Sequence, residues 1–147
     1  MVYVSAKEIT SRIAIASGSI HMRAETLALI LEDKIEKGDV FSVARVAGIM
    51  AAKKTSELIP MCHPLNITAV EIELTPQKEP ARVDIEATVR VSGKNGVEME
   101  AMTAVSVAGN AGEAGATVTV TVSGATGTPV TESVLSGLDG SYTASGI

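Results

Sequence analysis

The sequence is poor in aromatic residues and cysteine, and its last third contains no lysine or arginine. It has no tryptophan and one phenylalanine in 147 residues, and its net charge is -5. A nucleic-acid interface built on stacking rings and a broad basic surface is therefore excluded. The single cysteine, Cys62, excludes an internal disulfide framework and fits a reducing compartment such as the cytoplasm.

Long hydrophobic runs are also absent. No apolar stretch is long enough to cross a bilayer, and the first residues lack the basic start and apolar stretch of a secretory signal. With 46% hydrophobic and 20% charged residues, the chain is instead typical of one globular domain with a real core. We therefore expect a single cytoplasmic domain over residues 1–147.

The composition changes sharply near Ala108. All 12 lysines and arginines lie between Lys7 and Lys94, whereas residues 109–147 are rich in glycine, threonine and serine. We interpret residues 1–108 as the informative part of the domain and 109–147 as an atypical C-terminal region.

The hydrophobic pattern predicts an alternation of strands and helices. In chain order we expect a strand over 10–16 (with 2–4 also β-prone), helices over 23–31 and 40–57, strands over 70–74 and 83–89, a helix over 97–108 and a strand over 117–122. The two central strands share a short connector, so they should pair antiparallel. This β-α-β-β-α-β order is the plan of an α+β, ferredoxin-like split βαβ fold.

The helix over 40–57 carries specific expectations. Asp39 is placed to cap its N-terminus, after a turn in which Gly38 can adopt a positive φ. Apolar residues recur at i, i+3, i+4 and i+7, which predicts a core-facing stripe formed by Val43, Val46, Ala47 and Met50. Pro60 and Pro64 prevent this helix from continuing further along the chain.

Four polar clusters are candidates for chemistry. Lys37-Gly38-Asp39 and Ala52-Lys53-Lys54-Thr55 each suit a solvated helix end, but a lysine beside helix-end amides also suits phosphate binding or proton transfer. His63, bracketed by Pro60 and Pro64, is either a satisfied structural histidine or a substrate-contacting one.

Glu98 and Glu100 form the fourth cluster, where a turn enters a helix. Acidic groups stabilise a helix N-terminus, and they could equally accept hydrogen bonds from the amino and ring N–H groups of a guanine-like base. The neighbours Cys62 and His63 lack the further ligands that a zinc site needs, so no metal site is predicted. No Walker A, GxGxxG or HExxH motif is present.

Together these segments resemble the cyclic pyranopterin monophosphate synthase family, the accessory protein C (MoaC) family of molybdenum cofactor biosynthesis. The matching stretches are VSAK at 4–7 with Arg12, RAETLALI at 23–30, KGDVFSVARVAGIMAAKKTSELIPMCHPL at 37–65 and GKNGVEMEAMTAVSVA at 93–108. The resemblance covers about three-quarters of the chain.

The resemblance implies a lyase that converts 3′,8-cyclo-7,8-dihydroguanosine 5′-triphosphate to cyclic pyranopterin monophosphate with release of pyrophosphate. A radical S-adenosylmethionine enzyme makes that substrate from GTP. The family also implies a homo-oligomer, a hexamer of dimers, with its sites at dimer interfaces. No cofactor is evident, and a divalent metal requirement stays open.

Residue by residue, the resemblance implies that Lys37 is catalytic. It further implies that the substrate is bound by Met61, Cys62, His63, Glu98, Met99 and Glu100, with Arg12 and Lys53 near the phosphates. A triphosphate needs cations and a purine-like ring needs acceptors, so these assignments are chemically coherent.

Residues 109–147 depart from the family. Members continue after the last helix with a helical stretch whose aspartate and lysine are catalytic, and an ungapped continuation places Ala114 and Thr117 there. Neither side chain can transfer a proton or neutralise a phosphate at neutral pH. The alternative function is therefore an impaired relative that binds the phosphorylated pterin or serves as an assembly subunit. An RNA-binding split βαβ module is the weakest alternative, because the sheet lacks stacking aromatics.

Overall fold

The computed structural model describes residues 8–35, 38–109, 117–124, 130–136 and 142–145, with side chains described for the first two ranges only. Its strands are β1 (Thr10–His21), β2 (Ile67–Lys78), β3 (Ala81–Gly93), β4 (Thr117–Gly124), β5 (Val130–Ser136) and β6 (Tyr142–Ser145). Its helices are α1 (Ala24–Leu31), α2 (Val40–Lys53), α3 (Thr55–Leu58) and α4 (Glu98–Gly109). None of these helices is long and apolar enough to cross a membrane.

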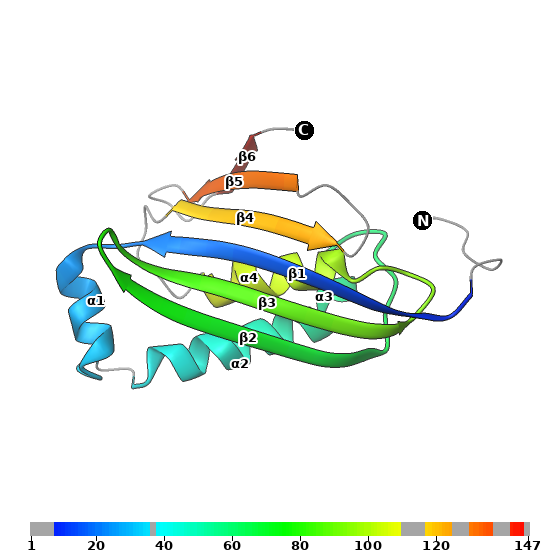
Figure 1. Cartoon of the computed structure of the whole chain (residues 1–147), viewed down its shortest axis with the longest axis horizontal. Coiled ribbons are helices and arrows are strands. Elements are labelled where there is room, and N and C mark those ends of the chain that lie inside the picture. Colours follow the sequence, from blue (N-terminus) through cyan, green and yellow to red (C-terminus); the bar gives the residue numbers. More distant parts are fainter. Residues whose placement is uncertain (1–7, 36–37, 110–116, 125–129, 137–141, 146–147) are drawn as a thin grey trace.

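The strands form one antiparallel sheet in the order β2-β3-β1-β4-β5-β6 (Figure 1). The order of its first four members, with helices connecting β1 to β2 and β3 to β4, is that of the split βαβ plan, so the predicted fold class is confirmed. β5 and β6 extend the sheet beyond β4 and were not predicted. β1 is also longer than the predicted strand, and residues 2–4 lie outside the described residues.

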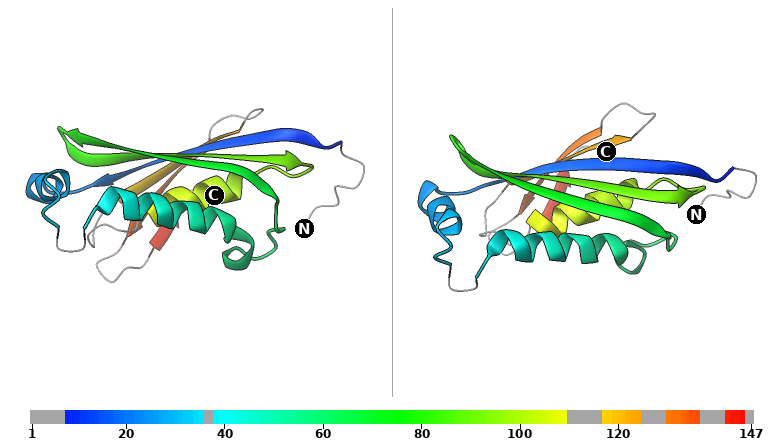
Figure 2. Two further views of the ribbon diagram at one scale, coloured as in Figure 1. Left: turned by 90° about the horizontal axis from the view of Figure 1, so that it is seen from below. Right: turned by 60° about the horizontal axis from the view of Figure 1, so that its bottom comes forward.

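Helices α2 and α4 cover one face of the sheet (Figure 2). α4 packs against β1, β3 and α2, while α2 packs against β2. The sheet contributes alternate residues to the core because successive strand side chains point to opposite faces. The core between β3 and α4 is formed by buried residues of both elements: Val83, Ile85, Ala87, Val89 and Val91 of β3, and Ala101, Ala104, Val105 and Ala108 of α4.

Several predictions of local structure are confirmed. Gly38 has a φ of +89°, and the Asp39 carboxylate accepts a hydrogen bond of 3.0 Å from the backbone N–H of Ser42, as an N-cap should. The hydroxyl of Ser42 donates a second bond to the same carboxylate, and this bond is the main cause that lowers the pKa of Asp39. β2 and β3 pair antiparallel throughout, with Glu71, Glu73 and Glu86 exposed.

The predicted core stripe of the second helix is wrong. Val43, Val46 and Met50 of α2 are 59%, 57% and 53% exposed, and the buried side of the helix carries Ala44, Gly48, Ala51 and Ala52. The reason is the close approach of α2 to α4. A Cβ built on Gly48 would lie 2.9 Å from the backbone oxygen of Ala104 and 3.1 Å from the Cβ of Ala108. Only small residues fit this contact, so Val43, Val46 and Met50 lie on the other side of α2.

The predicted helix over 40–57 is interrupted after Lys53. Thr55 is 1% exposed, and its Oγ1 donates to the carbonyl oxygens of Ala51 at 3.1 Å and Ala52 at 3.0 Å. The backbone N–H of Lys54 also donates to the carbonyl oxygen of Ala51, and the Thr55 hydroxyl adds further bonds to this last turn, where α2 stops and α3 begins as a separate short turn.

We predict that Gly48→Ala destabilises the protein. Alanine normally stabilises a helix interior by about 1 kcal/mol relative to glycine. Here the added methyl group overlaps Ile72 and the backbone of α4, which should cost about 1–3 kcal/mol and lower the midpoint of urea unfolding. Ala47→Gly on the partly exposed side of α2 is the control, and it should show only the ordinary glycine penalty. A raised midpoint for Gly48→Ala would contradict the close helix contact.

Candidate functional site

The Pro-bracketed loop after α3 begins with a tight turn. The N–H of Cys62 donates to the carbonyl oxygen of Ile59 at 3.4 Å, and Met61 has a φ of +61°. Proline at the second position and a positive φ at the third are features of a type II turn, in which glycine is the favoured third residue. Methionine in this conformation is strained, and such strain concentrates at functional sites. The turn leaves the Met61 side chain 74% exposed.

The turn places Cys62 against the first turn of α4. The Sγ of Cys62 donates to the Oε1 of Glu100 at 3.7 Å, although the two residues are 38 positions apart in sequence. Glu100 is 3% exposed, one of two buried polar or charged residues among those with described side chains. The structure therefore brings together two of the residues predicted to bind substrate.

Glu100 is a buried carboxyl without a cationic partner among the described residues. Burial raises the pKa of this carboxyl above its ordinary value, and the charge of Glu98 acts in the same direction. Burial is also the main cause that raises the pKa of the Cys62 thiol, followed by the charge of Glu100. The thiol is thus a hydrogen-bond donor to Glu100 at neutral pH, and it is not set up as a thiolate nucleophile.

Other predicted binding residues surround this pair. Glu98 and Met99 are exposed on the first turn of α4, and Gly96 leaves room for the Glu98 carboxylate to fold back over the preceding turn. His63 is half-buried directly after Cys62, and Lys53 is exposed at the C-terminal end of α2. α3, the start of α4 and the start of β1 all lie toward the same end of the sheet (Figure 1).

Two buried polar atoms at this end lack hydrogen-bond partners. One is the Nε of Arg12, which lies on β1 opposite Val91 of β3. The other is the Oδ1 of Asn95, four residues further along the chain in the turn before α4. Buried polar groups are nearly always bonded, so each of these atoms suits a ligand contact. Asn95 was missed in the sequence, where its place between two glycines indicates only a turn.

Lys37 lies outside the described residues. Asp39, two residues later, caps the N-terminus of α2, and Lys53 ends the same helix. A helix of 14 residues is about 20 Å long. The segment that carries Lys37 therefore joins the end of α2 opposite to the end that leads into the Cys62 loop.

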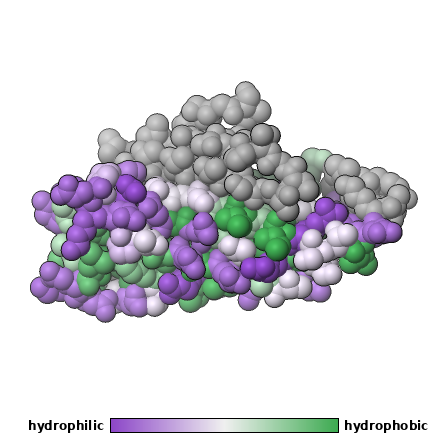
Figure 3. Space-filling model, viewed as in Figure 1, coloured by the Kyte–Doolittle hydropathy of each residue, from purple (hydrophilic) through white to green (hydrophobic). Residues whose placement is uncertain are grey.

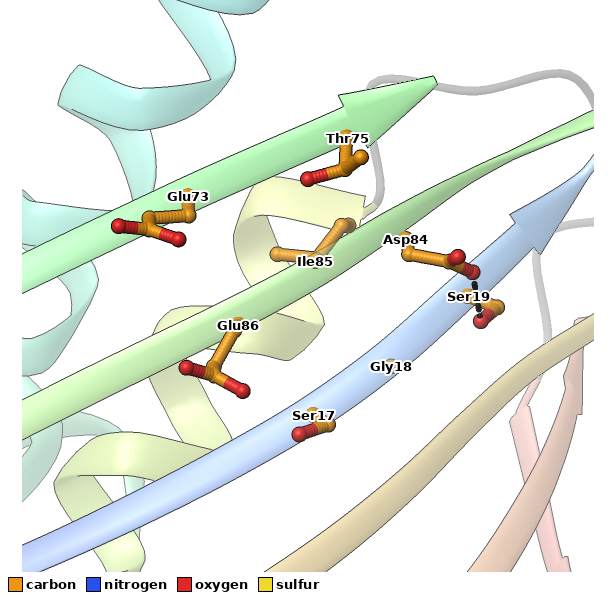
Figure 4. Close-up of a pocket in the computed structure, with 8 residues that line it drawn as sticks. All are labelled: Ser17, Gly18, Ser19, Glu73, Thr75, Asp84, Ile85 and Glu86. Carbon is orange, nitrogen blue, oxygen red and sulfur yellow. Dashed lines mark hydrogen bonds between the residues drawn. The ribbon is translucent and has the colours of Figure 1, made fainter. Parts of the chain in front are cut away.

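A separate polar concavity lies on the sheet face opposite the helices (Figure 4). It has a volume of about 400 Å³ and is lined by Ser17, Ser19, Glu73, Thr75, Asp84 and Glu86, among others. The Oγ of Ser19 donates to the Oδ1 of Asp84 at 2.7 Å, and the Nε of Arg82 contacts the same oxygen at 2.8 Å. The surface on this side mixes hydrophilic and hydrophobic residues (Figure 3). None of the predicted site residues lines it.

The chemistry available at the Cys62–Glu100 end is recognition of a ligand that has both donors and anionic groups. Glu100 can accept from N–H groups of a ring, and burial makes such a charge-assisted bond strong. Arg12 and Lys53 provide cations near the same end. In the part of the chain with described side chains, no group of three or more histidine, cysteine, aspartate or glutamate residues is arranged to hold a metal ion.

Comparison with known proteins gives a consistent picture. The model of the MoaC family matches residues 1–111. A protein of Pelotomaculum thermopropionicum named cyclic pyranopterin monophosphate synthase is 61% identical over 108 residues, which cover 74% of this chain and 64% of the relative. A protein of the same name from Dinoroseobacter shibae is 61% identical over 108 residues, covering 74% of this chain and 68% of the relative.

A third relative with this name, from Chloroflexus aurantiacus, is 56% identical over 108 residues and is covered over 66% of its length. The chain thus matches about two-thirds of the length of these relatives. The site residues from Arg12 to Glu100 all fall in the part matched by the family model.

We predict that Glu100→Gln stabilises the free protein at neutral pH. The folded pKa of this carboxyl is raised, so the native state holds the proton more tightly than the unfolded chain does. Its contribution to stability is therefore fully present below the unfolded pKa and is lost as the pH rises through the folded pKa. The stability of the glutamine variant should not fall with rising pH in this way. The variant should therefore unfold at a higher temperature than the native chain at pH 7.

Thermal unfolding measured from about pH 4 to pH 8 checks this prediction. Glu98→Gln, on the exposed side of the same helical turn, is the matched control and should change stability less. A Glu100→Gln variant that is less stable than the native chain at pH 7 would show that the carboxylate has a stabilising partner.

Proposed function

Because the chain belongs to the MoaC family, we propose that it is a cyclic pyranopterin monophosphate synthase of molybdenum cofactor biosynthesis. The substrate is 3′,8-cyclo-7,8-dihydroguanosine 5′-triphosphate, and the products are cyclic pyranopterin monophosphate and pyrophosphate. A radical S-adenosylmethionine enzyme acting on GTP supplies the substrate. A cytoplasmic location fits the unpaired Cys62 thiol, which has to stay reduced to donate to Glu100.

The observation that carries this proposal is the buried Glu100 carboxyl beside the Cys62 loop. A protein gains no stability from a buried acid whose described partner is a weak thiol donor, so its retention is best explained by a ligand. The reduced guanine-derived ring of the substrate offers amino and ring N–H donors to such an acceptor. Met99 and His63, which flank Glu100 and Cys62 in the sequence, complete the ring-binding part of the site.

The triphosphate needs cations. The buried Nε of Arg12 has no hydrogen-bond partner among the described residues and provides a donor of fixed geometry. Lys53 is exposed at the end of α2 and provides a second positive charge. A divalent cation, where the reaction requires one, would enter with the phosphates, because the described side chains contain no preformed group for it.

Lys37 is proposed as the catalytic residue that exchanges a proton with the substrate. Asp39, two residues after Lys37 in the sequence, caps the end of α2 that is far from the Cys62 loop. We therefore propose that each site is completed by a second copy of the chain within a homo-oligomer.

The ring-binding role is testable by calorimetry with the cyclised nucleotide. His63→Ala and Glu100→Gln should each weaken binding about 10-fold or more, since each removes a hydrogen bond to a polar or charged group. Glu71→Gln, an exposed carboxylate on the outer face of β2, is the control and should leave affinity unchanged. Unaltered affinity in both site variants would remove these residues from the site.

The C-terminal region bears on how fast this chain turns over its substrate. The family match ends at residue 111, α4 ends at Gly109, and Thr117 begins strand β4. Position 117 is therefore not part of a helix, and it lacks the lysine that the family resemblance implies there. Ala114 lies outside the described residues. We propose that the chain binds the nucleotide but turns it over slowly.

Restoring the two missing groups tests this proposal. Ala114→Asp together with Thr117→Lys should raise the rate of pyrophosphate release more than it raises affinity. A positioned acid or base typically contributes about 10²–10⁴-fold, which sets the upper range of the gain. The pair Ala114→Asn and Thr117→Gln is the uncharged control. Turnover by the native chain equal to that of the Dinoroseobacter shibae relative would overturn the proposal that this chain is slow.

A further inference from the structure

The side chain of Asn95 makes no hydrogen bond where one is expected. Asn95 lies in the turn that joins the end of β3 at Gly93 to the start of α4 at Glu98 (Figure 1). Its Oδ1 is buried, and its amide bonds to none of the residues that the structure describes. A buried acceptor without a partner costs free energy, so its presence calls for an explanation.

The backbone of the turn does not account for asparagine at this position. Asparagine is favoured in turns where the backbone has a positive φ or where its side chain bonds a neighbouring backbone group. Asn95 has no positive φ, and its side chain bonds no described backbone group. The residue is half-buried, so its amide borders the surface. A partner from outside the chain therefore fits this side chain better than a structural role does.

On one side, Asn95 is preceded by the strand end that faces Arg12. The alternation that buries Ala14 and Ala16 of β1 places Arg12 on the same face of the sheet, the face covered by the helices, directly opposite Val91 of β3. Arg12 forms no ion pair among the described residues. Its guanidinium is thus an uncompensated cation at the strand end that leads into the Asn95 turn.

On the other side, Asn95 is followed by the acidic first turn of α4. A Cβ built on Gly96 would overlap both carboxylate oxygens of Glu98. The Glu98 carboxylate therefore lies directly over the residue that follows Asn95. The turn that carries Asn95 thus connects the strand end opposite Arg12 to the helical turn that carries Glu98 and Glu100.

This order matches the order of groups in a nucleotide. In the proposed function, the ring meets Glu98 and Glu100, and the phosphates meet Arg12. The sugar joins the ring to the phosphates, so a side chain between these two subsites faces the sugar. The sugar presents neutral hydroxyl groups, and a neutral amide can accept from a hydroxyl without leaving a charge unpaired. In a 3′,8-cyclo nucleotide C3′ carries the bond to the ring, and the 2′-hydroxyl is on a carbon outside that bond.

We propose that Asn95 is a specificity-determining residue that binds the 2′-hydroxyl of the nucleotide sugar, with its Oδ1 as the acceptor. This assignment rests on the proposed function, since it takes the ring and phosphate subsites from there. A half-turn of the amide about its last side-chain bond exchanges the oxygen and the nitrogen with little change in shape. This rotation presents the oxygen to a ligand at the surface.

The first test is calorimetry with GTP and 2′-deoxy-GTP, which differ by this one hydroxyl. The native chain should bind GTP about 10-fold more tightly, and Asn95→Ala should bind the two nucleotides equally. Ser92→Ala, a loss of an exposed hydroxyl at the end of β3, is the control and should keep the 10-fold preference. A native chain without this preference, or an Asn95→Ala variant that keeps it, would overturn the contact.

The second test uses the conservative variant Asn95→Asp, which keeps the acceptor and the shape of the side chain. Its negative charge should weaken the binding of both triphosphates, but the preference for GTP over 2′-deoxy-GTP should remain. Loss of the preference in this variant would show that the acceptor does not bind the hydroxyl.

Thermal unfolding of the free protein separates this role from a structural one. Asn95→Ala removes a buried acceptor that has no partner, so the variant should be at least as stable as the native chain. A lower melting temperature together with an unchanged preference for GTP would make Asn95 a structural residue and overturn the proposal.

Calorimetry with the cyclised nucleotide distinguishes failure of this assignment from failure of the proposed function. Asn95→Ala should weaken this binding about 10-fold, as Glu100→Gln should. If Glu100→Gln weakens binding and Asn95→Ala does not, the sugar contact is overturned while the proposed function stands. If the native chain binds neither GTP nor the cyclised nucleotide, the proposed function is overturned and the sugar contact with it.

Discussion

The close contact between α2 and α4 determines much of what is unusual in this structure. Gly48 allows the backbone of α2 to approach Ala104 and Ala108 so closely that a methyl group would overlap its neighbours. The contact fixes which side of α2 is buried, and consequently leaves Val43, Val46 and Met50 exposed. The Cys62 loop, which follows α2 and α3, reaches the first turn of α4. A helix contact made of small residues thus determines which apolar side chains of α2 are exposed, next to the end of the sheet where we propose that the ligand binds.

At that end, stability and the proposed binding role make opposite demands on the Glu100 carboxyl. Burial disfavours the charged form of Glu100, and this cost is what makes the group a strong acceptor for a ligand with N–H donors. The Cys62 thiol satisfies part of its hydrogen-bonding capacity without a compensating charge. A lysine or arginine in place of Cys62 would stabilise the free protein better, but it would occupy the acceptor. The weak donor leaves the carboxyl available.

The sequence predicted the sheet well because its strands alternate strictly. Ile72 in β2 and Val83 to Val91 in β3 lie on the buried face, and the charged residues between them lie on the other. The orientation of α2 was not predictable from its own apolar periodicity, since that periodicity describes a surface stripe here. The informative signal was the set of small residues at 44, 48, 51 and 52, which indicates a close helix contact only when a partner with equally small residues is known. Two features of the candidate site could not be predicted from the sequence. The approach of Cys62 to Glu100 depends on tertiary packing. The burial of the Asn95 side-chain oxygen is not indicated by a Gly-Lys-Asn-Gly sequence, which predicts only a turn.

The C-terminal region shows that fold and chemistry place different demands on a sequence. β4 pairs with β1 through backbone groups, from Ala14 opposite Gly124 to Ile20 opposite Val118. A strand in this position needs residues of suitable β-propensity, and alternating threonine and valine meet that need. The sheet is thus extended by a strand that lies beyond the residues matched by the family model. Proton transfer and phosphate neutralisation depend instead on particular side chains, and Ala114 and Thr117 provide neither. The residues that we propose to bind the nucleotide all fall within the 111 residues that the family model matches, whereas Ala114 and Thr117, at the positions where we predict the family's catalytic aspartate and lysine, lie beyond that match.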